Sequence, residues 1–95
     1  MDKIIGKFIW NLAKEQENIH KHGVDFTLSL KVFADTKRKV YIDSKHTSKE
    51  ERLFCVGQVN GKILTVRFTY RQDRIRIFGA GYWRKGRSYY EKQKD

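Results

Sequence analysis

Residues 52–80 read RLFCVGQVNGKILTVRFTYRQDRIRIFGA, and this stretch decides the fold. It holds two runs of β-branched and aromatic residues separated by Asn60-Gly61, a pair that supplies the positive φ values of a type I′ turn. A second short connection, Arg71-Gln72-Asp73, leads into a third run of the same kind. The stretch therefore predicts a three-stranded antiparallel meander with strands at Arg52–Val59, Lys62–Tyr70 and Arg74–Ala80.

Side chains in this meander alternate between an apolar and a polar face. The apolar set comprises Leu64, Val66, Phe68, Ile75 and Ile77. Where that set covers the core, the opposite face carries Arg67, Arg74 and Arg76 together, with Arg52 as a candidate fourth member. Like charges side by side repel each other. A cluster of arginines on one sheet face therefore favours an anion site over an ordinary solvated surface.

The residues before the meander predict a helix and two further strands. Asn11 has the short acceptor side chain of an N-cap, and Gly23 suits the left-handed residue that ends a helix. These two residues predict a helix over 12–22. An apolar run over 3–10 predicts one strand before the helix, and Lys39–Asp43 predicts another strand after it.

The segment after this helix, residues 24–33, fits two secondary structures. Every second residue is apolar, which favours a strand. Phe26, Leu30 and Phe33 also keep helical spacing, and Asp25 is a suitable N-cap. Both interpretations stay open on propensity alone.

The segment after the meander interleaves aromatic residues with cations, beginning with Tyr82, Trp83 and Arg84. Aromatic rings stack on bases while cations hold phosphates, so this segment suits RNA. The alternative is that the two aromatic residues close the core and the cations are solvated. Residues 87–94 then predict a short C-terminal helix.

Composition limits the size of the fold and the class of partner. The 95 residues suffice for one domain, 1–95, and are too few for two cores. Lys and Arg number 21 against 11 Asp and Glu, and the net charge of +10 favours an anionic partner. A single cysteine, Cys55, excludes a disulfide framework and a multi-cysteine metal site. The first ten residues are too short and too charged for a signal peptide or membrane span, so we expect a cytoplasmic protein without membrane contact.

A series of motifs runs in order from residue 8 to residue 91. They are Phe8-Ile9-Trp10-Asn11 with Lys14, NIHKHGVDF at 18–26, Val32-Phe33-Ala34-Asp35, Glu51-Arg52 with Gly57, Thr69, Arg71, DRIRI at 73–77, and Tyr90-Glu91. In this order they resemble the BrnT family of ribonuclease toxins from type II toxin–antitoxin systems. The KHGV and RIRI segments are fairly specific when they occur together. Many members carry Ile-Ser-Ala-Arg where this chain has Phe78-Gly79-Ala80-Gly81.

The resemblance implies an α+β fold like that of RelE and ParE toxins, with helices packed on a small antiparallel sheet and residues 26–34 helical. It also implies an endoribonuclease that inhibits translation and is neutralised by a BrnA-type antitoxin. The antitoxin is the DNA-binding member of such a pair, so we expect no direct DNA binding by the toxin alone. Two toxins and two antitoxins are expected to form a heterotetramer.

RNA cleavage without a metal needs a base for the ribose 2′-hydroxyl, cations for the charged transition state, and an acid for the leaving 5′-oxygen. From the resemblance we predict catalytic roles for five residues: His22 or Glu51 as base or acid, and Arg52, Arg67 and Arg74 as phosphate-stabilising cations. The predicted substrate-binding residues are Lys21, Arg76, Tyr82, Trp83 and Arg84. We expect neither a metal ion nor a cofactor.

Alternatives stay open for two of these residues and for the function. His22 equally fits a structural role at the end of its helix, and Glu51 fits a structural pair with a neighbouring arginine. A toxin of this fold can also act by binding its target, as ParE does on gyrase. A third function is a non-catalytic or decayed toxin-fold protein that only binds nucleic acid.

Overall fold

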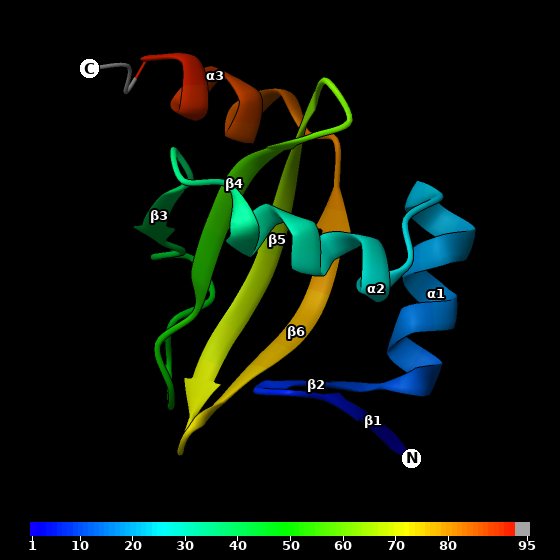
Figure 1. Ribbon diagram of the computed structural model, residues 1–95. Helices are drawn as coiled ribbons and strands as arrows, with labels where there is room; N and C mark the ends of the chain where they lie inside the picture. The colour runs from blue at the N-terminus through cyan, green and yellow to red at the C-terminus, as the bar shows by residue number, and fades with distance from the viewer. Residues whose placement is uncertain (93–95) are drawn as a thin grey trace.

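The chain was analysed as a computed structural model, in which residues 1–92 are described. Within those residues one mixed sheet of six strands, ordered β1-β2-β6-β5-β4-β3, is covered by helices (Figure 1). The elements are β1 (Asp2–Ile5), β2 (Phe8–Asn11), α1 (Leu12–His22), α2 (Phe26–Ser29), the 3-10 helix η1 (Leu30–Ala34), β3 (Lys39–Ile42), β4 (Leu53–Val59), β5 (Lys62–Arg71), β6 (Arg74–Gly81) and α3 (Arg84–Lys92). The predicted α+β class is confirmed.

The strands β4, β5 and β6 form the predicted antiparallel meander. Asn60 and Gly61 have φ values of 52° and 81°, as a type I′ turn requires. Gln72, in the second connection, has a φ of 58°. Both tight connections predicted from the sequence are therefore confirmed.

The N-terminal segment differs from the single strand predicted over residues 3–10. Gly6 adopts a φ of 58° and reverses the chain, so the segment is a hairpin of β1 and β2. Ile4 and Ile5 of β1 are exposed, whereas Trp10 of β2 is buried in the core. Strand β2 then runs parallel to β6, which makes the sheet mixed rather than purely antiparallel.

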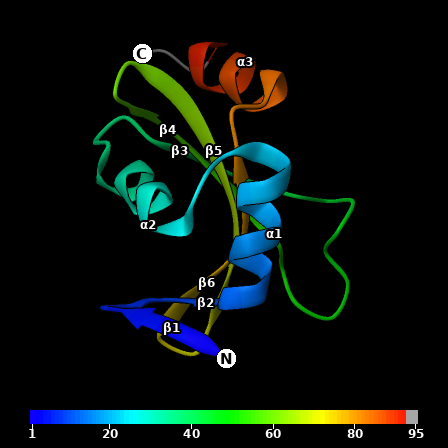
Figure 2. The ribbon, with the colours of Figure 1, turned by 90° about the vertical axis from the view of Figure 1, so that its right-hand side faces the viewer.

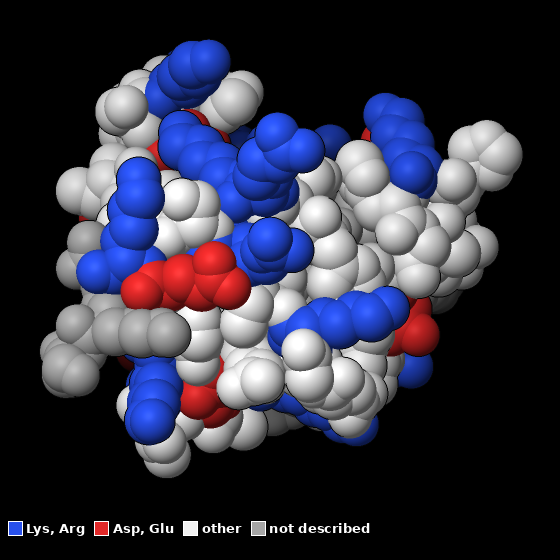
Figure 3. All heavy atoms as spheres, turned by 90° about the horizontal axis from the view of Figure 1, so that it is seen from above, with Lys and Arg blue, Asp and Glu red and all other residues white. Residues whose placement is uncertain are grey.

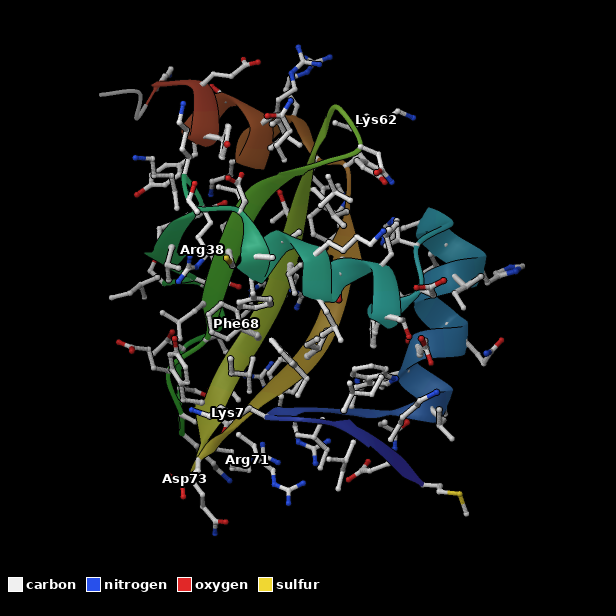
Figure 4. All side chains as sticks on the ribbon, viewed as in Figure 1. Lys7, Arg38, Lys62, Phe68, Arg71 and Asp73 are labelled. Carbon is white, nitrogen blue, oxygen red and sulfur yellow. The ribbon has the colours of Figure 1, made fainter. Side chains whose placement is uncertain are left out.

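The core lies between the sheet and the helical segment α2–η1, with α1 packed against β6 and β2 (Figures 1 and 2). Phe68 of β5 lies beneath α2–η1 (Figure 4), and its ring meets Phe33 edge-on with centroids 5.2 Å apart. Figure 2 shows the loop between β3 and β4 leaving on the opposite side of the sheet. One face of the sheet is therefore core, and α3 covers Thr65 and Val56 on the other face, whose remaining part is available for a site.

Helix α1 has the predicted bounds and caps. The Asn11 side chain accepts a hydrogen bond from the Lys14 amide at 3.0 Å, and Gly23 has a φ of 69°. Toward the core the helix presents Glu15, which accepts from the Trp10 indole at 3.1 Å and from the Phe26 amide at 2.9 Å. The buried carboxylate thus ties α1 to β2 and to the start of α2.

Residues 24–33 are helical, as the family resemblance implied and against their alternation. Asp25 caps α2 by accepting from the Leu28 amide at 2.7 Å. Strand β4 accommodates η1 through Gly57, where a Cβ atom would lie 2.8 Å from the Val32 carbonyl oxygen. The close backbone contact lets Phe26 and Val32 both reach the core from helical turns.

The C-terminal helix starts at Arg84, three residues earlier than predicted, and the part of the prediction covering residues 93 and 94 lies outside the described residues. Gly86 is buried within the first turns of α3. A Cβ atom there would lie 1.8 Å from the Thr65 hydroxyl, so the helix rests directly on β5. No helix within residues 1–92 is long and apolar enough to cross a membrane.

Asp35 fastens α3 to the rest of the fold. Its carboxylate accepts hydrogen bonds from the Gln58 amide at 2.7 Å, the Tyr90 hydroxyl at 2.7 Å and the Lys37 amide at 2.9 Å. Burial opposes ionisation of Asp35, but these donors outweigh it and lower its pKa. The same hydrogen bond raises the pKa of Tyr90 to about 12.

Asp35→Asn is expected to lower the free energy of unfolding at neutral pH by about 1–3 kcal/mol, because the Gln58 amide loses a charged acceptor. A carboxylate whose pKa is lowered by folding stabilises the protein above its unfolded pKa, and this contribution is lost as the pH falls through the folded pKa. The difference between variant and wild type should therefore shrink between neutral pH and about pH 3. Urea unfolding at both pH values measures it, and an equal difference at both would contradict the role of the charge.

Candidate functional site

The face of the sheet opposite α2 carries arginines from several strands. Strand register places Arg67 beside Gly79, Arg76 beside Thr69, and Arg74 beside Arg71. We call this surface the arginine face and define it by Arg52, Arg67, Arg74 and Arg76. The alternation of β5 and β6 thus places the predicted set on one face.

A bulge in β6 shapes this face. Phe68 pairs with Ile77 but Arg67 pairs with Gly79, so Phe78 is an extra residue without a register partner. The guanidinium carbon of Arg52 lies 3.9 Å from the centroid of the Phe78 ring. Beyond the bulge, a Cβ atom on Gly79 would lie 3.7 Å from Arg67 Nη1. The Arg67 guanidinium therefore lies against the Gly79 backbone.

A pocket of about 260 Å³ lies between α1 and the arginine face. It is lined by Lys14, Glu17, Asn18, Lys21, His22, Arg52, Arg67, Phe78 and Gly79. We call it the anion pocket, because its lining holds four Lys or Arg side chains and a single carboxylate. It brings together the sequence-predicted residues Lys21, His22, Arg52 and Arg67, which come from α1, from the residue before β4 and from β5.

Asn18 sets the position of α1 against β6. Its side-chain amide donates to the Ala80 and Val24 carbonyls, each at 2.9 Å, and its oxygen accepts from the Ala80 amide at 3.1 Å. Lys21 and His22 follow Asn18 by three and four residues, so they share its side of the helix. The buried amide of Asn18 therefore holds both residues beside the sheet.

Six predicted catalytic or binding residues lie outside the anion pocket, and three of them, Tyr82, Trp83 and Arg84, line another cavity described below. Arg76 is mostly buried and forms an ion pair with Asp2, Nη2 to Oδ2 at 2.9 Å. Arg74 is exposed beside the β5–β6 turn, where Figure 4 labels Arg71 and Asp73. Glu51 is exposed, and its backbone carbonyl accepts a hydrogen bond from the Thr69 hydroxyl.

Glu50 makes the ion pairs that the sequence suggested for its neighbour Glu51. Its carboxylate meets Arg71 at 2.8 Å and Arg52 Nε at 3.7 Å. The hydrogen bond from Arg71 holds the pKa of Glu50 below its usual value. Arg52 is thereby held at the rim of the anion pocket by a charged partner.

Tyr82, Trp83 and Arg84 line a second cavity, of about 720 Å³, between α3 and the β4–β5 turn. Lys62 in that turn lies 5.4 Å from the Tyr82 ring centroid. Figure 3 views the molecule from this end and shows basic side chains outnumbering acidic ones. Trp83 also meets His22 edge-on, with ring centroids 5.2 Å apart, so the two cavities are neighbours.

Lys14 and Glu17 line the anion pocket and were missed by the sequence analysis. They precede Lys21 by seven and four residues, which is the spacing of one helix face. The polar stripe was therefore visible in the sequence. His46 was also missed as a site residue: its Nδ1 lies 2.8 Å from Asp43 Oδ2, a contact that depends on how the β3–β4 loop folds.

The described residues 1–92 contain no group of three or more His, Cys, Asp or Glu side chains able to hold a metal ion. A family model described as a ribonuclease toxin, BrnT, of type II toxin–antitoxin systems matches residues 10–86 of the chain. The matched segment includes every residue that lines the anion pocket. No curated protein matches the chain.

Proposed function

The chain belongs to this family of ribonuclease toxins, and from that premise we propose that it is a metal-independent endoribonuclease whose reaction takes place in the anion pocket. It is the toxin of a type II toxin–antitoxin pair, so RNA is its substrate and a protein antitoxin its partner. The observation that carries the proposal is the convergence of Lys21, His22, Arg52 and Arg67 in one pocket.

The two pocket arginines suit a phosphodiester. A guanidinium group donates to two oxygens at once and stays charged at any physiological pH. Arg67 of β5 lies against Gly79, and Arg52, the residue before β4, stacks on Phe78, so both line the pocket. Together with Lys21 they would bind the scissile phosphate and stabilise the extra negative charge of the pentavalent transition state.

His22 is the proposed proton-transfer group. In the first step it takes the proton of the ribose 2′-hydroxyl, the 2′-oxygen attacks phosphorus, and the bond from phosphorus to the 5′-oxygen breaks. The His22 imidazolium formed in this way returns a proton to the leaving 5′-oxygen, directly or through water, which gives a 2′,3′-cyclic phosphate and a 5′-hydroxyl end. Glu17, rather than the predicted Glu51, is the carboxylate that lines the pocket and can assist.

The charge of the pocket supports cleavage without a metal. Nucleases that use two metal ions need several carboxylates to hold them. The anion pocket offers four basic side chains for its single carboxylate, Glu17, so its cations would meet the phosphate directly.

The antitoxin is proposed to be of the BrnA type and to cover the arginine face in a complex of two toxins and two antitoxins. A net charge of +10 favours an acidic partner surface, and burying the cations would block RNA. Size-exclusion chromatography with light scattering of the co-expressed pair measures the stoichiometry directly.

The purified protein is expected to cut RNA equally well with and without EDTA and to leave 2′,3′-cyclic phosphate ends. The assay uses total RNA and a defined single-stranded oligonucleotide, with ends identified by mass spectrometry. Loss of cleavage in EDTA, or 3′-hydroxyl ends, would contradict the metal-independent mechanism. Absence of cleavage by a folded protein would contradict the proposal that the free toxin is the active enzyme.

A further inference from the structure

A third pocket, of about 260 Å³, adjoins the anion pocket on the arginine face. It is lined by Tyr41, His46, Phe54, Thr65, Arg67, Trp83, Lys85 and Gly86. We call it the aromatic pocket, because three aromatic side chains from distant segments of the chain contribute to it. Its volume lies below the roughly 300–1,000 Å³ typical of sites for drug-sized ligands, so it suits a single ring system.

The aromatic walls are fixed by packing. Tyr41 and Phe54 are register partners and stack with centroids 4.9 Å apart at an angle of 24°. Tyr89 of α3 packs on the other side of Tyr41, with centroids 4.2 Å apart. Trp83 approaches from the segment after β6 and is held over Gly81, where a Cβ atom would lie 2.6 Å from the indole ring. Such rigid rings stack on a base with little loss of side-chain freedom.

Arg67 connects this pocket to the proposed site of cleavage. It lines both pockets, and it pairs with Phe54 across the β4–β5 ladder. A nucleotide whose phosphate is bound by Arg67 therefore has its base within reach of Phe54. Because the two pockets share a side chain, one bound strand of RNA can occupy both.

We propose that the aromatic pocket binds one unstacked nucleobase of single-stranded RNA, next to the phosphate bound at Arg67. The proposal rests on the proposed function, because it takes the anion pocket as the phosphate site. Bases in an RNA duplex are stacked and paired and cannot enter such a pocket. Single-stranded RNA is therefore the expected substrate class.

Binding is tested with a short single-stranded 2′-O-methyl RNA, which lacks the nucleophilic hydroxyl and cannot be cut. An abasic site is placed at each position in turn, and affinity is measured by fluorescence anisotropy. One abasic position should weaken wild-type binding about tenfold, since stacking of a base on an aromatic side chain contributes about 1–3 kcal/mol. Phe54→Leu should bind the intact probe about tenfold more weakly than the wild type does. Introducing that abasic site should then cause no further loss of affinity in the Phe54→Leu variant.

Tyr70→Leu is the matched control, because Tyr70 is an exposed aromatic residue of β5 that lines neither pocket. It should bind both probes as the wild type does. The proposal is overturned when no abasic position weakens binding, or when Phe54→Leu and the abasic site lower affinity independently. If the abasic and Phe54→Leu effects on binding are as expected but ordinary RNA is not cleaved, the proposed function is overturned. The proposal of a nucleobase site is then still supported.

Discussion

Arg67→Gln is expected to lower kcat/KM for RNA cleavage by about two to three orders of magnitude, the usual cost of removing one preorganised donor from a charged transition state. Arg67 is the side chain shared by the anion and aromatic pockets. It forms no ion pair within residues 1–92, so the free energy of unfolding should change little. Steady-state cleavage of a fluorogenic oligonucleotide and urea unfolding measure the two quantities.

Arg38→Gln is the control for the loss of one positive charge. Arg38 lies next to β3 (Figure 4) and donates to the Asp35 carbonyl at 3.2 Å, outside both pockets. Equal activity losses in the two variants would mean that total charge, rather than the position of Arg67, governs cleavage. A loss confined to KM would assign Arg67 to binding of the ground state alone.

His22→Ala is expected to lower kcat by about two to four orders of magnitude, the range contributed by a positioned general base or acid. Added imidazole should restore part of the activity, because it can enter the space left by the side chain and transfer the proton. A purely structural role for His22 gives no such rescue. The measurement is the cleavage rate at saturating RNA as a function of imidazole concentration.

His20→Ala is the matched control on the same helix. His20 is exposed and lies two residues from His22, so it points to a different side of α1. Its replacement should leave cleavage unchanged. A His22→Ala protein that cuts RNA at the wild-type rate would move the proton-transfer role to another residue of the pocket.

The parts of the fold that the sequence predicted well are those decided by local chemistry. Asn60-Gly61 allows few backbone geometries other than a tight hairpin turn, and Asn11 and Gly23 specify the two ends of α1. The alternation of β5 and β6 also placed Arg67 and Arg76 on the face opposite the core. In each case the residues that matter are within a few positions of one another.

The sequence was a poor guide where tertiary contacts decide the structure. The apolar run at 3–10 carries no sign that Gly6 reverses the chain or that β2 pairs in parallel with β6. Residues 24–33 alternate like a strand, yet they pack as helical turns because Gly57 opens space on β4. Arg76 fitted the arginine cluster by alternation, but its charge is taken up by Asp2, 74 residues away in sequence.

The candidate site also divides into residues that local sequence identifies and residues that only tertiary contacts bring together. Lys21, His22, Arg52 and Arg67 were identified from motifs and alternation, and the structure places them together. The aromatic pocket was not foreseen, because Tyr41 and Phe54 lie on strands joined by a loop whose path the sequence does not specify. Trp83 was assigned to RNA from the interleaving of aromatic residues with cations in its segment, which does not reveal the partners that fix its ring.

The bulge at Phe78 makes the length of β6 as important as its residue types. The extra residue reverses which positions face outward, so that Gly79 and Gly81, rather than larger side chains, lie under Arg67 and Trp83. In a homologue that lacks one residue between Ile77 and Trp83, the side chains that follow would exchange faces of the sheet. The residues that now face the core would then face RNA, even if every remaining residue were the same. Insertions and deletions in this short segment should therefore redirect specificity more abruptly than substitutions do.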